Sequence, residues 1–314
     1  MKIIYVLSDA KLHCDRWNNS ISTKEGGGLT VTEQMDQKYQ EDLERIQGFR
    51  LIDDDFMTIC FEDEPECIGL VLQIVLDQPT LEIKDVRTQV FVENLRNHSV
   101  RFDVLATNSL GIRYNCEIQR SDKGAGRKRA RYHSSMMDIN LLKKSEDFDK
   151  LSETYVVFIT ENDVLKQGKS VYHIERHILE TGEAFHDGSH ILYVNGSYRD
   201  DTPIGKLMHD FSCTNPDDMY YAVLADRVRF FKESKKGVAI MCRVIEEMRM
   251  ESFEEGKIEG KIEGKMEGKI EGKLEGKIEG IKLVAQSMLE TGRYALEEIA
   301  NLSGLSLEEV KALK

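Results

Sequence analysis

Two acidic residues lie close together in the sequence, in segments whose composition favours β-strands. Asp103 belongs to RFDVLAT and Glu117 to IRYNCEIQ, and Gln119 follows the glutamate by two positions. Paired carboxylates can hold a divalent cation and so activate a phosphate ester for hydrolysis. The first question is therefore whether the chain brings both acids to one point.

The loop between the two segments predicts that it does. Ser109, Leu110 and Gly111 form a three-residue connection with glycine at the position that takes the left-handed conformation, which is a common hairpin loop. In the antiparallel pair that results, Val104 faces Cys116 on the core side, where the thiol is buried and inert. Asp103 faces Glu117 on the other side.

Two like charges directly opposite each other destabilise a sheet, so something must offset their repulsion. One solution is Mg²⁺, for which Mn²⁺ can substitute, bound by both carboxylates. The other solution is a structural ion network at a solvated sheet face, in which Arg101, Arg113 and Arg120 neutralise the acids. The two residues alone leave both alternatives open.

A strongly basic segment follows the second strand and favours the metal alternative. Between residues 101 and 133 eight Lys and Arg stand against three acidic residues, within an acidic chain. Gly124 and Gly126 precede a predicted helix, whose first amides also favour an anion. We therefore expect a phosphodiester site, with the metal at the acids and DNA phosphates along the basic segment. Its basic residues are Arg120, Lys123, Arg127, Lys128, Arg129 and Arg131, joined by His133.

The surrounding elements predict an α/β core of helix, three-stranded meander, helix and strand. The run at 66–76 is apolar on nearly all sides and predicts a buried helix, and residues 82–93 form the strand before the hairpin. Residues 124–144 predict the second helix, and TYVVFIT at 154–160 predicts a central strand. A further hairpin is expected within 170–196, followed by a helical C-terminal extension.

The composition divides the chain into four parts. Residues 1–40 are polar and read as an N-terminal extension with little order, and 41–250 hold the core with a helical subdomain. Residues 251–280 contain a G-K-I-E repeat, and 281–314 are a small helical tail, whose last two helices have helix-turn-helix spacing.

The repeat is either a helix that pairs with another copy or a loosely helical tether. Each glycine costs a helix about 1 kcal/mol relative to alanine, and like charges recur every four residues. Pairing would bury the apolar residues and let opposite charges meet, so we expect a homodimer or higher oligomer through this segment.

Overall composition excludes several other classes of protein. The net charge of −13 disfavours nucleic acid or membrane contact except at a local basic patch. Six cysteines without a C-x-x-C pair indicate reduced thiols and a cytoplasmic location, and no apolar run is long enough to span a membrane. No Walker A or G-x-G-x-x-G motif is present, so no nucleotide cofactor is expected.

The motifs EIQ (117–119) and RARYHSSM (129–136), together with D-x13-E-x-Q, resemble the PD-(D/E)XK nuclease superfamily. More narrowly, they are similar to the Rpn-type recombination-promoting nucleases, the PD-(D/E)XK nuclease family transposases. The resemblance covers roughly residues 50–250. It implies a restriction-endonuclease-like core, which agrees with the element order derived above.

The resemblance also implies a role for each site residue. Asp103 and Glu117 would bind the metal, and Gln119 occupies the place of the superfamily's catalytic lysine. Arg131 and Tyr132 match a recurring Arg-Tyr pair of the helix. An upstream acid would complete the site, and it is either Glu66 or one of three consecutive residues, Asp53, Asp54 and Asp55.

Two functions follow from this reading. The first is a Mg²⁺-dependent DNA endonuclease acting in recombination or mobile-element processes. The second is a DNA-binding or assembly module on the same fold with weak or lost catalysis, because a neutral glutamine can only orient water by hydrogen bonding.

Overall fold

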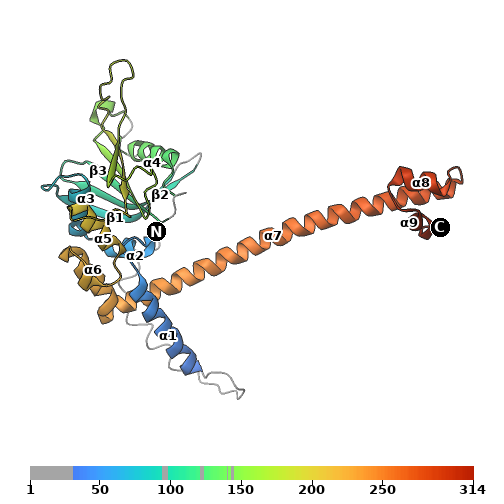
Figure 1. Ribbon diagram of the computed structural model, residues 1–314, viewed down its shortest axis with the longest axis horizontal. Coiled ribbons are helices and arrows are strands. Elements are labelled where there is room, and N and C mark those ends of the chain that lie inside the picture. The colour runs from blue at the N-terminus through green and yellow to red at the C-terminus, as the bar shows by residue number, and fades with distance from the viewer. Residues whose placement is uncertain (1–30, 94–97, 121–123, 140, 143–144) are drawn as a thin grey trace. The chain divides into compact units, whose positions relative to one another are not determined.

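The structure is a computed structural model that describes residues 31–314 except 94–97, 121–123, 140 and 143–144. The chain divides into two compact units, residues 1–238 and 239–314, and each is described by itself (Figure 1). The part of the predicted extension before residue 31 lies outside the described residues. None of the described helices combines the length and apolar character needed to cross a membrane.

The first unit begins with three helices. Helix α1 (Val31–Gly48) is rich in good helix formers, so residues 31–40 are helical and the expectation of little order there is wrong. Helix α2 (Asp54–Phe61) carries two acids in its first turn. Helix α3 (Pro65–Val75) starts with proline at a favoured position and buries most of its residues, which confirms the helix predicted at 66–76.

A six-stranded mixed sheet follows, in the order β1-β2-β3-β4-β6-β5. The antiparallel meander consists of β1 (Ile83–Val92), β2 (Val100–Asn108) and β3 (Arg113–Gln119). After helix α4 (Arg127–Ile139), strand β4 (Thr154–Thr160) joins β3 in parallel. This order of helix, meander, helix and strand confirms the predicted core. The hairpin expected within 170–196 is formed by β5 (Val171–Ile174) and β6 (Ser189–Asn195).

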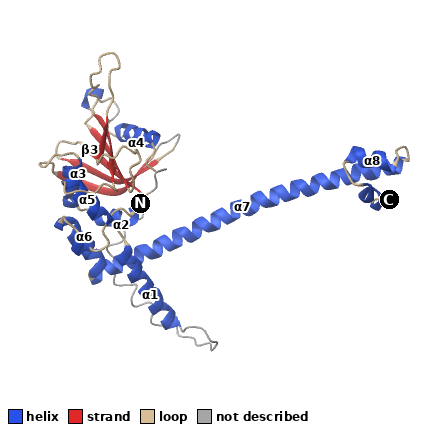
Figure 2. Ribbon diagram, in the orientation of Figure 1, coloured by secondary structure: helices blue, strands red, loops and turns tan. Residues whose placement is uncertain are grey.

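The two faces of the sheet are covered by different helices. Figure 2 shows α4 on one face and α2 and α3 on the other. Beneath α4 lies a buried apolar cluster that includes Phe102, Ala130, Met136 and Phe158. Helices α5 (Pro203–Ser212) and α6 (Ala222–Glu233) complete the unit, and short 3₁₀ turns occupy Phe148–Lys150 and Pro216–Asp218.

The hairpin between β2 and β3 has the predicted connection and register. Gly111 adopts a φ of 80°, and the Asn108 carboxamide oxygen accepts hydrogen bonds from two backbone amides of the loop. Val104 pairs with Cys116 and Ala106 with Tyr114, as predicted. The regular pairing stops at Val104, one residue before Asp103 is reached.

The second unit is helical. Helix α7 (Lys235–Thr291) runs without interruption through all the tetrapeptide repeats and on into the predicted helical tail, which was expected to begin at residue 281. Helices α8 (Leu296–Ser303) and α9 (Leu307–Ala312) follow turns at Gly292 and Gly304, both with positive φ. The buried side chains of Ala285, Ile299 and Val310 join α7, α8 and α9. The compact units divide at residue 238, whereas the composition changes near residue 250.

Candidate active site

Asp103 and Glu117 meet where strands β2 and β3 separate. The backbone N–H of Asp103 donates to Glu117 Oε1 at 3.4 Å, and the N–H of Ile118 donates to Asp103 Oδ2 at 3.2 Å. Carboxylates thus accept backbone amides at the point where the regular strand pairing ends. The structure brings the two predicted acids together and ties each to the backbone beside the other.

Glu117 is held by three further side chains. Arg129 Nη2 lies 3.3 Å from Glu117 Oε2, and His133 Nδ1 lies 3.2 Å from Glu117 Oε1. The Asn115 side-chain amide donates to the same Oε1 at 3.0 Å. Arg129 also donates to His133 Nε2 at 3.3 Å. One face of α4 therefore supplies a cation and an imidazole to the acid on β3.

The expectation of a solvated sheet face with three neutralising arginines is wrong. Asp103 is 5% exposed and Glu117 is 0% exposed, and Arg129 and His133 of α4 lie against Glu117. Arg120 instead pairs with Asp53 at 3.1 Å and lies 3.8 Å from Glu161. The cation that reaches the acid pair comes from α4 and not from the strands.

Burial and neighbouring charge change the acidity of Asp103. Loss of hydration, followed by the charges of Glu117 and Asp54, raises the pKa of Asp103 to about 8. Burial likewise raises the pKa of Asp54, to which the charge of Glu117 contributes. These mutual effects mean that Asp54, at the start of α2, belongs to the same electrostatic site as the acid pair.

Asp54 has an additional feature that distinguishes it from the other upstream acids. Its Oδ1 is buried and has no hydrogen-bond partner among the described residues. Asp53 is engaged with Arg50 and Arg120, and Asp55 is exposed. A buried carboxylate oxygen without a partner is costly unless a ligand satisfies it.

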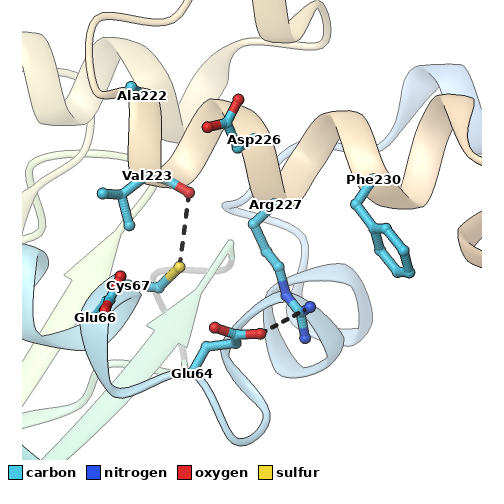
Figure 3. A pocket seen from close by; sticks show the side chains of 8 residues that line it. All are labelled: Glu64, Glu66, Cys67, Ala222, Val223, Asp226, Arg227 and Phe230. Carbon is cyan, nitrogen blue, oxygen red and sulfur yellow. Dashed lines mark hydrogen bonds and ion pairs between the residues drawn. The ribbon is translucent and has the colours of Figure 1, made fainter.

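Glu66 occupies a different place. It is exposed on α3 and lines a groove of about 380 Å³ between α3 and α6 (Figure 3). The same groove contains the ion pair between Arg227 and Glu64, with a separation of 2.9 Å. The structure therefore groups Glu66 with α6 residues.

Gln119 is the last residue of β3 and is half-buried. Its carbonyl accepts a hydrogen bond from the N–H of Glu161, which follows β4, at 3.1 Å. It lies two residues after Glu117 on the same strand, so its side chain points to the same face of the sheet.

The predicted DNA-binding residues differ in their exposure and in their contacts. Arg127, Lys128 and Arg131 are exposed on α4. Arg120 and Arg129 are also exposed in part, but both are engaged with carboxylates. Tyr132 donates its hydroxyl to the backbone carbonyl of His98 at 2.5 Å. Lys123 lies outside the described residues.

The part of the chain described by the structure contains no group of three or more His, Cys, Asp or Glu side chains arranged to hold a metal ion. The donor chemistry nevertheless fits a hard divalent cation, because Asp54, Asp103 and Glu117 are all carboxylates, and the charge of Glu117 raises the pKa of both Asp54 and Asp103. A cation would satisfy Asp54 Oδ1 and offset this repulsion. It would also compete with the proton on Asp103 and with Arg129.

Asn115 was not identified as a site residue from the sequence, and His133 was placed in the basic segment and not beside Glu117. A signal for His133 was present, since Arg129 and His133 are four residues apart and so share one face of a helix. Asn115 precedes Glu117 by two residues on β3, which puts both side chains on one face of the sheet.

A comparison with models of protein families gives a match that covers part of this site. Residues 65–197 match the family model described as PD-(D/E)XK nuclease family transposase. The chain matches no curated protein and no solved structure. The matched segment contains Asp103, Glu117 and Gln119 as well as α4. Over residues 65–197 the chain is therefore similar to the PD-(D/E)XK nuclease family transposases.

Proposed function

We propose that the protein is a divalent-metal-dependent DNA endonuclease that acts in recombination or mobile-element processes in the cytoplasm. The observation that carries this proposal is the group of three acids on α2, β2 and β3, in which Asp54 Oδ1 is buried without a partner beside the acid pair. The family match supports nuclease chemistry for residues 65–197, which include Asp103 and Glu117 but not Asp54.

Asp54, Asp103 and Glu117 are the residues that would hold the cation, with Mg²⁺ as the expected ion and Mn²⁺ as a substitute. When bound, such an ion polarises the scissile phosphate and lowers the pKa of an attacking water. For a cation to bind here, Asp103 would be ionised and Glu117 would no longer be paired with Arg129. His133 and Asn115 keep the Glu117 carboxylate in position as its partner changes.

Gln119 would orient the water through its carboxamide oxygen, which accepts a hydrogen bond but cannot take the proton. Arg127, Lys128 and Arg131 would bind backbone phosphates, since exposed basic side chains on one helix release counterions when they meet DNA. Arg129, once released from Glu117, is placed to stabilise charge at the phosphate.

Plasmid cleavage tests this proposal. Supercoiled plasmid is incubated with the full chain in Mg²⁺, in Mn²⁺ and in EDTA. We expect nicking in either metal, none in EDTA, and loss of nicking in Asp103→Asn. Equal nicking by Asp103→Asn and the unsubstituted chain would refute the catalytic assignment.

A set of three substitutions tests the upstream acid. We expect Asp54→Asn to reduce nicking by about 100-fold, as for loss of a group that orients a catalytic ion. Asp55→Asn is the matched control on the same helix turn, and Glu66→Gln tests the alternative acid on α3. A large loss in Glu66→Gln with none in Asp54→Asn would contradict the assignment.

The second candidate is a DNA-binding or assembly module with weak or absent catalysis. Two observations favour it: glutamine at position 119, and the contacts that already satisfy both oxygens of Glu117. It predicts metal-independent DNA binding without nicking, so the plasmid assay and a binding titration on the same samples distinguish the two candidates.

A further inference from the structure

The repeat in α7 presents one apolar stripe that is open to solvent. It consists of one residue from each of six successive repeats, and each of these is 42–66% exposed: Ile258, Ile262, Met266, Ile270, Leu274 and Ile278. Exposed apolar residues in a regular row indicate a surface that another molecule covers.

The charges of the repeat cannot pair within their own helix. Ion pairs along a helix form between residues three or four apart. Each lysine here is two or six residues from the nearest glutamates, and equal charges are four apart, as for Lys261 and Lys265. Lys257 reaches Glu254 at 3.6 Å, but Glu254 precedes the first glycine of the repeat. The lysines and glutamates of the repeat can therefore form ion pairs only with a partner outside their own helix.

The order of residues in the repeat determines how these charges flank the apolar stripe. Successive residues of a helix are about 100° apart around its axis. Lysine precedes the apolar residue and glutamate follows it, so the two charges lie on opposite flanks of the stripe. The glycines lie on the far side of the helix, where an added Cβ would have no atom within 4 Å.

This arrangement is complementary to itself in one orientation. If two copies face each other through the apolar stripe and run in parallel, a twofold axis along the helices brings each lysine flank beside the partner's glutamate flank. If the copies are antiparallel, the twofold axis is perpendicular to the helices, and lysine then meets lysine while glutamate meets glutamate. Charge complementarity thus identifies both the partner and its direction.

We propose that the repeat segment of α7 binds a second copy of this chain in parallel, through the apolar stripe and its two charged flanks. The stripe turns by about 40° per repeat, so the helices cross and share a few repeats at a time. The interaction is weak, and both chains enter the paired segment from the same end. This inference does not rest on the proposed nuclease function.

A charge-exchanged chain provides the test. In it every repeat lysine becomes glutamate and every repeat glutamate becomes lysine, from Lys257→Glu and Glu259→Lys through Glu279→Lys. Composition, net charge, glycines and apolar stripe are unchanged. Parallel pairing requires this full-length variant to dimerise as well as the natural chain, but not to form mixed dimers with it, because lysine would then meet lysine.

Sedimentation equilibrium measures self-association of each full chain, and energy transfer between differently labelled chains measures mixed dimers. We expect self-association in both proteins, roughly tenfold weakened by high salt, and no mixed dimers. Mixed dimers would instead show antiparallel pairing, and a monomer at every concentration would exclude pairing altogether.

A variant with Ile262→Gln, Met266→Gln and Ile270→Gln tests whether the apolar stripe is the interface. It should be monomeric while its circular dichroism stays helical. Undiminished association of this variant would place the contact elsewhere in the chain and overturn the proposal.

Discussion

Arg129 donates to Glu117 across 3.3 Å, from an exposed helix surface to a carboxylate that is 0% exposed. The negative charge at the centre of the candidate site is therefore neutralised by the chain itself. A metal ion and Arg129 are alternative partners of Glu117, and several measurable consequences depend on this competition.

Arg129→Ala should destabilise the metal-free protein by about 1–3 kcal/mol, because it leaves a buried acid without its cation. Mg²⁺ or Mn²⁺ should then raise the melting temperature more in the variant than in the natural chain. Thermal unfolding with and without metal measures both effects. Arg127→Ala, two residues earlier and exposed, is the control and should change stability by less than about 0.5 kcal/mol. An equal response to metal in both variants would argue against competition at Glu117.

The raised pKa of Asp103 predicts how the stability of the metal-free protein changes with pH. The native state keeps this proton at pH values where the unfolded chain has lost it. The contribution of Asp103 to the free energy of unfolding is therefore greatest at low pH and falls until the pH passes about 8. The loss is at most about 1.4 kcal/mol per pH unit. Asp103→Asn should remove this dependence and be more stable than the natural chain at pH 9.

Urea unfolding in EDTA at several pH values from 5 to 9 provides the measurement. Asp201→Asn, an exposed substitution, should keep the slope of the natural chain. If Asp103→Asn keeps that slope as well, Asp103 is not the titrating group.

Lys232→Met should destabilise the first unit by about 2–4 kcal/mol. The Lys232 ammonium is 2% exposed and donates to the carbonyls of Gln47, Phe49 and Thr214, which methionine would leave without a donor. Lys236→Met, at an exposed position of α7, is the matched control. Urea unfolding of both variants at pH 7 tests this, and similar midpoints would show that the three carbonyls find other donors.

Replacing Arg127, Lys128 and Arg131 with alanine should weaken DNA binding to all sequences alike. Each lost phosphate contact should reduce the slope of log affinity against log salt by about 0.9. A fluorescence anisotropy titration at several salt concentrations measures this. The control replaces Lys84, Lys166 and Lys169, three exposed lysines that belong to other segments than α4. If the control loses as much affinity as the test variant, DNA does not bind along α4.

The meeting of Asp103 and Glu117 could be predicted from the sequence because a short loop determines it locally. Gly111 can adopt positive φ without strain, and the register of the hairpin follows from that turn. Contacts that depend on how α4 crosses the sheet could not be predicted in this way. Arg129 and His133 reach Glu117 only because the crossover helix packs on the sheet, chiefly over β4 and β6.

The upstream acid shows the same limit. Asp53, Asp54 and Asp55 are identical in type and consecutive, so no spacing rule separates them. The direction of each side chain at the start of α2 determines which of them belongs to the site. Asp54 interacts with the acid pair, whereas Asp53 pairs with Arg50. Whether the repeat forms a regular helix could not be predicted for a similar reason. Seven glycines disfavour a helix locally, whereas helix formation is cooperative over the whole of α7.

The three carbonyls that accept hydrogen bonds from Lys232 belong to residues that precede residue 65 or follow residue 197 in the sequence. They therefore lie outside the segment that matches the family. The segment recognised by its sequence is therefore smaller than the segment that must fold together. An excised fragment of residues 65–197 would lose Phe56, Phe211 and Phe231, all of which are buried in the intact unit. Such a fragment should be readily degraded by protease, whereas a fragment ending at residue 238 retains Lys232 with all three of its acceptors.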